Sequence, residues 1–180
     1  MDVAMLRADC ARCAGLCCVV LAFDRSALFA EDKPAGTPCI HLGSDCRCRI
    51  HASRKQRGYA GCVSYDCLGA GQRATALLIG CAATAVEQFE VFAAIHRQHE
   101  LLTLLHAADA LPLSPEHRVR REALLQQTEA ADMLSAAGRR TFLAGPLPGE
   151  VRTFLSQLRS YVDDRHRSDR LAGPRRQLPV

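Results

Sequence analysis

The stretch "CARCAGLCC", residues 10–18, places four cysteines within nine positions. Cys10 and Cys13 form a C-x2-C pair, in which two sulfurs on one tight turn can reach the same metal, as they do in zinc and iron–sulfur sites. Cys17 and Cys18 are neighbours whose side chains point in different directions, so they are poorly placed to bind one ion together. Either each of them faces one of two metal centres, or one is a ligand and its neighbour packs in the core.

The remaining cysteines extend this pattern across the first half of the chain. The sequence has 180 residues and ten cysteines, and after the first four they stand at Cys39, Cys46, Cys48, Cys62, Cys67 and Cys81. So many thiols at these spacings favour metal binding over burial as small apolar residues. We expect burial only for Cys81, because it lies in the apolar run "ALLIGCAATAV", residues 76–86.

Charge and hydropathy restrict the cellular context. The N-terminus lacks the basic start and apolar run of a signal peptide, and no apolar run approaches the roughly 20 residues of a membrane span. We therefore expect a cytoplasmic protein, in which disulfides are rare. The net charge of +4 is mild and does not by itself call for nucleic acid or a membrane surface as partner.

Basic residues lie among the cysteines, at Arg47, Arg49, Arg54, Lys55 and Arg57. Four thiolates around a divalent ion leave a charge of about −2, which a site of low dielectric must balance. These side chains therefore either stabilise thiolates or form a solvated basic face, and no nucleic-acid motif accompanies them. His41 and His51, near Cys39 and Cys48, are candidate substitute ligands.

The second half of the chain predicts helices. From about Thr84 the sequence is rich in Ala, Leu, Glu, Gln and Arg, and apolar residues recur at helical spacing over residues 84–111. A second helix is expected to begin at Ser114 and Pro115 and to stop at Gly138. A third begins near Pro148 and carries an apolar stripe. Three helices with short connections suggest an antiparallel bundle.

The first half is less regular and rich in turns. We expect a short strand at residues 18–23, one or two helical turns at 51–58 and a helix over 67–80. Such a segment is too small to fold on its own apolar core, so it needs a staple, and in a cytoplasm that staple is a metal. The predicted fold is mainly α: an irregular, metal-stapled Cys-rich domain (1–82), a three-helix bundle (84–170) and a flexible tail (171–180).

Other candidate chemistry is weaker. His96, His99 and His106 share one face of the first long helix, which is either a metal-binding face or a polar or packing surface. The sequence contains no zinc-protease motif, phosphate-binding loop, nucleophile elbow or dinucleotide fingerprint.

Several of these pieces resemble a known family. "CARCAGLCC" with the later "CRCRIH" and "GCVSYDC" is similar to the YkgJ-type cysteine-cluster proteins, which are described as zinc- or iron-chelating or as carrying an iron–sulfur cluster. "DKPAGTPC", "GYAGCVSYDCLGAGQ" and "HELL" further resemble the N-terminal region of actinobacterial pentapeptide-repeat proteins, although the repeats themselves are absent. The resemblance implies eight metal ligands, which are Cys10, Cys13, Cys17, Cys18, Cys39, Cys48, Cys62 and Cys67. Cys46 and Cys81 fall outside its pattern.

The expected function is metal binding, with an iron–sulfur cluster of the 4Fe–4S type favoured for structure, electron transfer or redox sensing. The unequal cysteine spacings look less like two zinc knuckles. A structural zinc module acting as an interaction or accessory protein is the first alternative, with the helical bundle as the surface for a protein partner. The second alternative is a cluster-dependent enzyme that modifies a peptide or protein, since some flagellin lysine N-methylases carry a similar cysteine cluster.

Overall fold

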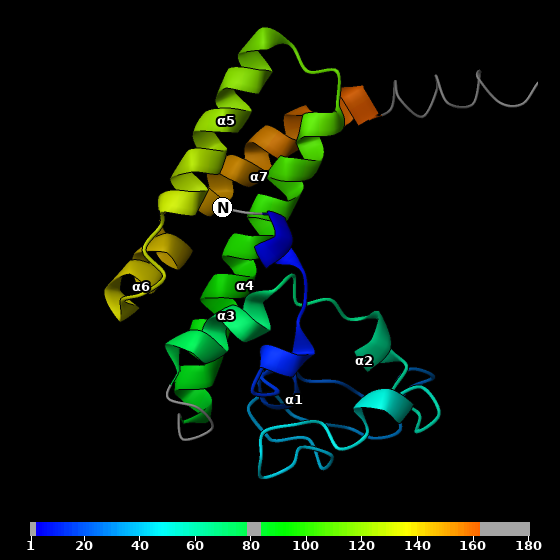
Figure 1. Cartoon of the computed structure of the whole chain (residues 1–180). Helices are drawn as coiled ribbons and strands as arrows, with labels where there is room; N and C mark the ends of the chain where they lie inside the picture. Colours follow the sequence, from blue (N-terminus) through cyan, green and yellow to red (C-terminus); the bar gives the residue numbers. More distant parts are fainter. Residues whose placement is uncertain (1–2, 79–83, 163–180) are drawn as a thin grey trace, which may run out of the picture.

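A long helix forms the axis of the molecule. The computed structural model describes residues 3–78 and 84–162, and α4 (Ala85–Ala107) is its longest element. A capping box starts this helix: the Thr84 hydroxyl accepts from the Glu87 N–H, and the Glu87 carboxylate accepts from the Thr84 N–H. Helices α1, α3, α5, α6 and α7 all contact α4 (Figure 1). The position of each half of the chain is therefore set by this one helix.

The part of the chain after α4 contains more helices than expected. The 3-10 turn η5 (Ala108–Ala110) is followed by α5 (Pro115–Ala130), α6 (Ala136–Ala144) and α7 (Leu147–Gln157). Ser114 caps α5 and Pro115 opens it, as predicted. The stop at Gly138 is wrong, and so is the count of three helices, because Gly138 lies in the first turn of α6 and donates its N–H to the Ser135 side chain.

The Cys-rich half consists of short turns and helices. In chain order they are η1 (Val3–Leu6), η2 (Cys10–Arg12), α1 (Cys17–Val20), η3 (His51–Ser53), α2 (Gly61–Ser64) and α3 (Ala70–Leu77). The strand expected at residues 18–23 is wrong: residues 17–20 form α1, and Phe23 makes only an isolated bridge with Lys33. The predicted turn at 51–58 and the helix after Cys67 are present.

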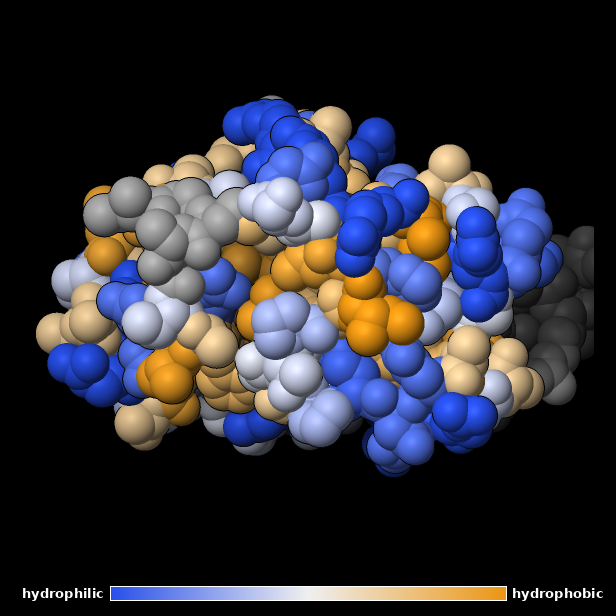
Figure 2. Space-filling model, turned by 90° about the horizontal axis from the view of Figure 1, so that it is seen from below, coloured by the Kyte–Doolittle hydropathy of each residue, from blue (hydrophilic) through white to orange (hydrophobic). Residues whose placement is uncertain are grey.

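Both halves share one hydrophobic core. From α4, the fully buried Ile95, Leu101 and Leu102 belong to it, and Leu6, Leu16 and Ala70 of the Cys-rich half pack into the same cluster. Leu124, Val151 and Phe154 complete it from α5 and α7. The prediction of a mainly α fold is confirmed. Seen from the end that carries the Cys-rich half, the surface mixes apolar and charged residues (Figure 2).

Some predictions lie outside the described residues. They are the burial of Cys81, the tail at 171–180 and residues 163–170 of the expected bundle. Within the described ranges, no helix has both the length and the apolar character needed to cross a membrane.

Candidate metal centre

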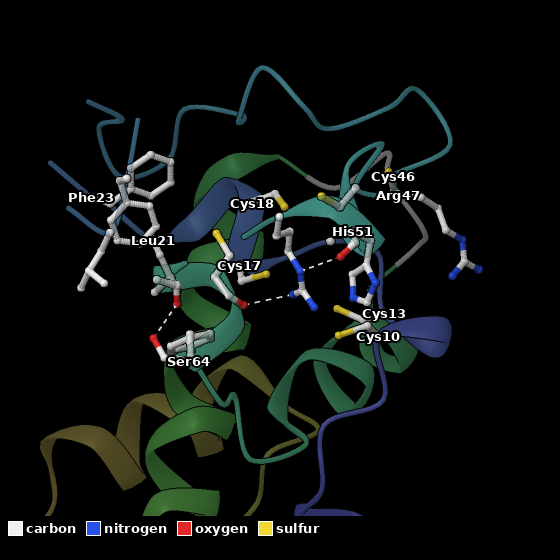
Figure 3. A pocket seen from close by; sticks show the side chains of 18 of the residues that line it. Cys10, Cys13, Cys17, Cys18, Leu21, Phe23, Cys46, Arg47, His51 and Ser64 are labelled. Carbon is white, nitrogen blue, oxygen red and sulfur yellow. Dashed lines mark hydrogen bonds between the residues drawn. The ribbon is translucent and has the colours of Figure 1, made fainter. Parts of the chain in front are cut away.

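A cavity of about 630 Å³ opens in the Cys-rich half, and thiols form much of its wall. Six free cysteines line it, which are Cys10, Cys13, Cys17, Cys18, Cys48 and Cys62. Cys39 and Cys67 are also free thiols but lie outside this wall. In Figure 3, Cys10 and Cys13 lie side by side beneath His51, while Leu21 and Phe23 stand on the opposite side of the cavity. The cavity is therefore thiol-rich at one end and apolar at the other.

The turn between the first two cysteine pairs depends on Gly15. Its φ of +64° is a left-handed conformation that favours glycine, and a Cβ there would lie 2.8 Å from the Cys46 carbonyl oxygen. The Cys18 N–H donates to the Gly15 carbonyl at 2.8 Å and begins α1. This close approach brings the segment 10–18 against the segment that carries Cys46 and Cys48.

Cys10, Cys13 and Cys67 form a first group of thiols. A Cβ on Gly71 of α3 would lie 2.8 Å from the Cys13 sulfur and 3.5 Å from the Cys67 sulfur, so the bare backbone at this position leaves room for both. Burial raises the pKa of Cys10, and the neighbouring thiols Cys17, Cys67 and Cys13 raise it further. These three cysteines, distant in the sequence, therefore share one electrostatic environment.

Cys18, Cys39, Cys48 and Cys62 form a second group. The Cys39 N–H donates to the Cys18 carbonyl at 2.8 Å, and an isolated bridge joins Leu42 to Cys48. Burial raises the pKa of Cys62 to about 11, and Cys17, Cys39 and Cys48 contribute in the same direction. Burial is also the main reason that the pKa of Cys39 is raised, and Cys48 again adds to it.

Cys17 lies between the two groups. A side-chain hydrogen bond with Cys18 lowers the pKa of Cys17 to about 7 and raises that of Cys18. Cys17 also raises the pKa of Cys10 and Cys13 on one side and of Cys62 on the other. The adjacent cysteines of the opening motif thus connect two sets of thiols.

Two of the five basic side chains, Arg47 and Arg54, line the cavity. The Arg54 guanidinium donates to the carbonyls of His51 and Cys62 at 2.8 and 3.0 Å, and its charge lowers the pKa of Cys10, Cys17 and Cys62. Arg47 also lines the cavity and donates to the Ala11 carbonyl at 2.6 Å, Arg49 donates to the Ile40 carbonyl on the surface, and Lys55 and Arg57 are exposed. Thiolate stabilisation therefore fits Arg54, and a solvated face fits Lys55 and Arg57.

Of the candidate histidines, one lines the cavity and others pack against neighbouring side chains. His51 lines the cavity, whereas the His41 ring packs edge-on against Tyr59 with centroids 5.0 Å apart. On α4, the His99 Nδ1–H donates to the Leu68 carbonyl at 2.7 Å and the ring is fully buried. His96 stacks between Tyr65 and Phe92. Packing therefore accounts for His96 and His99.

Two features were not expected from the sequence. Tyr65 lines this cavity, and its buried hydroxyl has no hydrogen-bond partner among the described residues. Burial raises the pKa of Tyr65, and Cys67, Cys17, Asp66 and Cys13 raise it further. Cys46 is disulfide-bonded, whereas the cytoplasmic location expected from the sequence predicts that disulfides are rare. Its exclusion from the eight candidate ligands agrees with that bond.

The thiols suit a soft metal, but they lie too far apart to bind a single ion directly. All eight candidate ligands carry free thiols, and thiolates prefer zinc, copper(I) and iron–sulfur clusters. The buried Tyr65 hydroxyl and the bare backbone of Gly71 border the first group. Within residues 3–78 and 84–162, however, no three Cys, His, Asp or Glu side chains stand close enough together to hold an ion directly.

Comparisons with known proteins show a relative of uncharacterized function. The chain is 33% identical over 172 residues to uncharacterized protein YybG of Bacillus subtilis strain 168, and the match covers 92% of this chain and 62% of the relative. The chain thus spans less than two thirds of the length of the curated relative it matches. No protein-family model matches the chain, and no solved structure matches it. The resemblance to YkgJ-type proteins stays a prediction.

Proposed function

We propose that this protein holds an iron–sulfur cluster on its cysteine thiolates and uses it for structure, electron transfer or redox sensing. The observation that carries the proposal is the cavity of about 630 Å³ whose wall includes six free thiols. Few other uses account for so many unpaired thiols on segments that are distant in the sequence. When bound, a cluster supplies one-electron redox chemistry.

The spacing of the sulfurs favours a cluster over a single ion. Four sulfurs bound to one zinc at about 2.3 Å lie only about 3.8 Å from one another. Around a cluster each iron takes its own cysteine, so the protein sulfurs lie farther apart. Thiols that line a wide cavity without converging in threes on one point are closer to the second arrangement.

The surrounding residues supply a positive charge and apolar side chains. Arg54 brings a fixed positive charge to Cys10, Cys17 and Cys62. Leu21, Phe23, Leu28 and Phe29 line the same cavity, and the rings of Phe23 and Phe29 stack with centroids 4.3 Å apart. Apolar side chains beside the thiols reduce the screening of the attraction between thiolates and the guanidinium.

Metal analysis of anaerobically purified protein tests the proposal. We expect brown protein that bleaches in air and yields iron and acid-labile sulfide in comparable amounts. Cys13→Ser and Cys62→Ser should lower both contents, whereas Cys46→Ser, which breaks a disulfide but removes none of the eight candidate ligands, should retain them. Wild-type protein without metal, or equal loss in all three variants, would overturn the proposal.

A structural zinc module is the alternative, because the all-cysteine donor set with its C-x2-C pair suits zinc equally well. It predicts colourless anaerobic protein with stoichiometric zinc and no sulfide. The apolar end of the cavity favours a further alternative, an enzyme that modifies a peptide or protein. That function predicts iron and sulfide together with a visible spectrum that shifts when S-adenosylmethionine or a peptide is added.

A further inference from the structure

Lys33 is a buried lysine held in one position. Its side chain is only 5% exposed, and the ammonium donates to the carbonyls of Val19, Pro34 and Thr37 at 3.1, 3.1 and 2.8 Å. It also lies over the Phe23 ring, 5.7 Å from the centroid. Three bonds satisfy all three donors of the ammonium, so the charge is fixed and cannot turn toward water.

The carboxylates of the same loop do not balance this charge. Among the described residues, no ion pair includes Lys33. Glu31 accepts from the Tyr59 hydroxyl, and Asp32 accepts from the Arg25 N–H. Burial lowers the pKa of Lys33, and the neighbouring thiols Cys39, Cys18, Cys17 and Cys62 act in the opposite direction, in that order. A buried cation is costly unless an anion lies nearby, so the surroundings of Lys33 favour thiolates.

Backbone hydrogen bonds tie Lys33 to the cysteines of the second group. Lys33 and Phe23 exchange both of their backbone hydrogen bonds, at 2.8 and 3.0 Å. The Val19 carbonyl, which accepts a hydrogen bond from the Lys33 ammonium, also accepts one from the Gly36 N–H. On the same two segments, the Cys39 N–H donates to the Cys18 carbonyl. The lysine therefore holds together the two segments that present Cys18 and Cys39.

We propose that Lys33 is the fixed counter-cation of a separate metal centre held by Cys18, Cys39, Cys48 and Cys62. This inference rests on the proposed function and extends it, because Cys10, Cys13, Cys17 and Cys67 are left to form the other centre. Lys33 acts as a positioning residue that touches the backbone of the site and favours its thiolates through charge. Arg54 provides charge to Cys10 and Cys17 of the other centre and also to Cys62, so Lys33 is the cation whose hydrogen bonds lie beside Cys18 and Cys39.

The first experiment separates the charge of Lys33 from its hydrogen bonds. Lys33→Gln keeps donors but loses the charge, Lys33→Arg keeps the charge, and Lys55→Gln removes an exposed lysine as the control. Metal content is measured while the pH is lowered, since protons compete with the metal for thiolates. In Lys33→Gln we expect about half of the bound metal to be lost at a higher pH than in the wild type. Lys33→Arg and the control should follow the wild-type curve.

The second experiment assigns the effect to one centre by double variants. Cys39→Ser already removes the second centre, so adding Lys33→Gln should change the remaining curve no further. Cys67→Ser removes the first centre, so adding Lys33→Gln should shift all of the remaining metal. The same readout applies to iron and to zinc.

Each outcome decides between defined alternatives. Wild-type protein without metal would contradict the proposed function itself. Metal-loaded Lys33→Gln with an unchanged curve would show that the lysine is only a structural tether. A shift of equal size in both double variants would contradict the division into two centres.

Discussion

Because Gly71 has no side chain, the Cys13 and Cys67 sulfurs of the first group can lie close to its backbone. Gly71 lies inside α3, where replacing glycine by alanine normally stabilises a helix by about 1 kcal/mol. Here the new methyl group would stand 2.8 Å from the Cys13 sulfur. The local gain in helix propensity and the tertiary contact therefore have opposite signs at this position.

We expect Gly71→Ala to lower the metal content and to reduce stability by about 1–3 kcal/mol, the usual cost of overpacking. Gly149→Ala is the matched control, because it is also helical and a Cβ there meets nothing within 4 Å. That variant should retain its metal and gain up to about 1 kcal/mol. Urea unfolding and metal analysis measure both effects. A Gly71→Ala protein that is fully loaded and more stable would contradict the packing argument.

At the scale of elements, α4 connects to the cysteine region through a histidine. The buried His99 ring donates to the carbonyl of Leu68, the residue after Cys67, at 2.7 Å. Leu68 has a positive φ of 51°, and Gly69 after it is the N-cap of α3. The hydrogen bond therefore fixes the turn that places Cys67 beside α3.

This bond should make stability depend on pH. Burial lowers the pKa of His99, and the charges of Arg73 and His96 lower it further. The hydrogen bond to Leu68 raises this pKa but does not offset the other effects. As the pH is lowered, the His99 ring of the unfolded chain takes up a proton near pH 6.5, at a higher pH than in the folded chain. The unfolding free energy should therefore fall as the pH drops below about 6.5 and level off below the pKa of folded His99.

The matching variant is His99→Leu. It should lose about 1–3 kcal/mol at pH 8, because the Leu68 carbonyl is left unpaired, and it should show a smaller decrease toward acid. Denaturant unfolding at several pH values measures both. Parallel pH profiles for the two proteins would rule out His99 as the titrating group.

The sequence predicts some helix boundaries well and others badly, for local reasons. Thr84 with Glu87 and Ser114 with Pro115 are strong start signals, and α4 and α5 begin there. The break before α6 lacks glycine and proline, since the Asp132 carboxylate makes the turn by accepting from the N–H groups of Leu134 and Ser135. Gly138 therefore looked like a stop although it follows a new start.

At the scale of the whole molecule, spacing predicts which cysteines belong together less well than it predicts their chemistry. The C-x2-C pair indicates a shared site for Cys10 and Cys13, and both line the cavity. Cys67 joins them only because α3 packs against η2, and that contact is tertiary. Lys33 gives no local signal either, because a lone lysine in a turn-rich segment reads as exposed, whereas here it is buried.

The two halves should respond differently when the metal is removed. The helices of the Cys-rich half contain three to eight residues each, so they lack the length to persist alone. In contrast, α4, α5 and α7 share buried residues of their own, such as Leu101, Leu124 and Val151. The binding energy of the metal is part of the folding energy of the segment that it holds together. Removing the metal should therefore mainly destabilise residues 3–78.

We therefore expect chelation to make the segment between Cys10 and Cys67 sensitive to protease while much of the helical circular dichroism signal remains. The part of α4 that contacts α1 and α3 should lose protection as well. Cys13→Ser protein, purified without chelator, should already resemble the chelated wild type, whereas Cys46→Ser should not. Unchanged protease resistance after complete metal removal would mean that the shared apolar core alone, through Leu6, Leu16 and Ala70, holds the Cys-rich half in place.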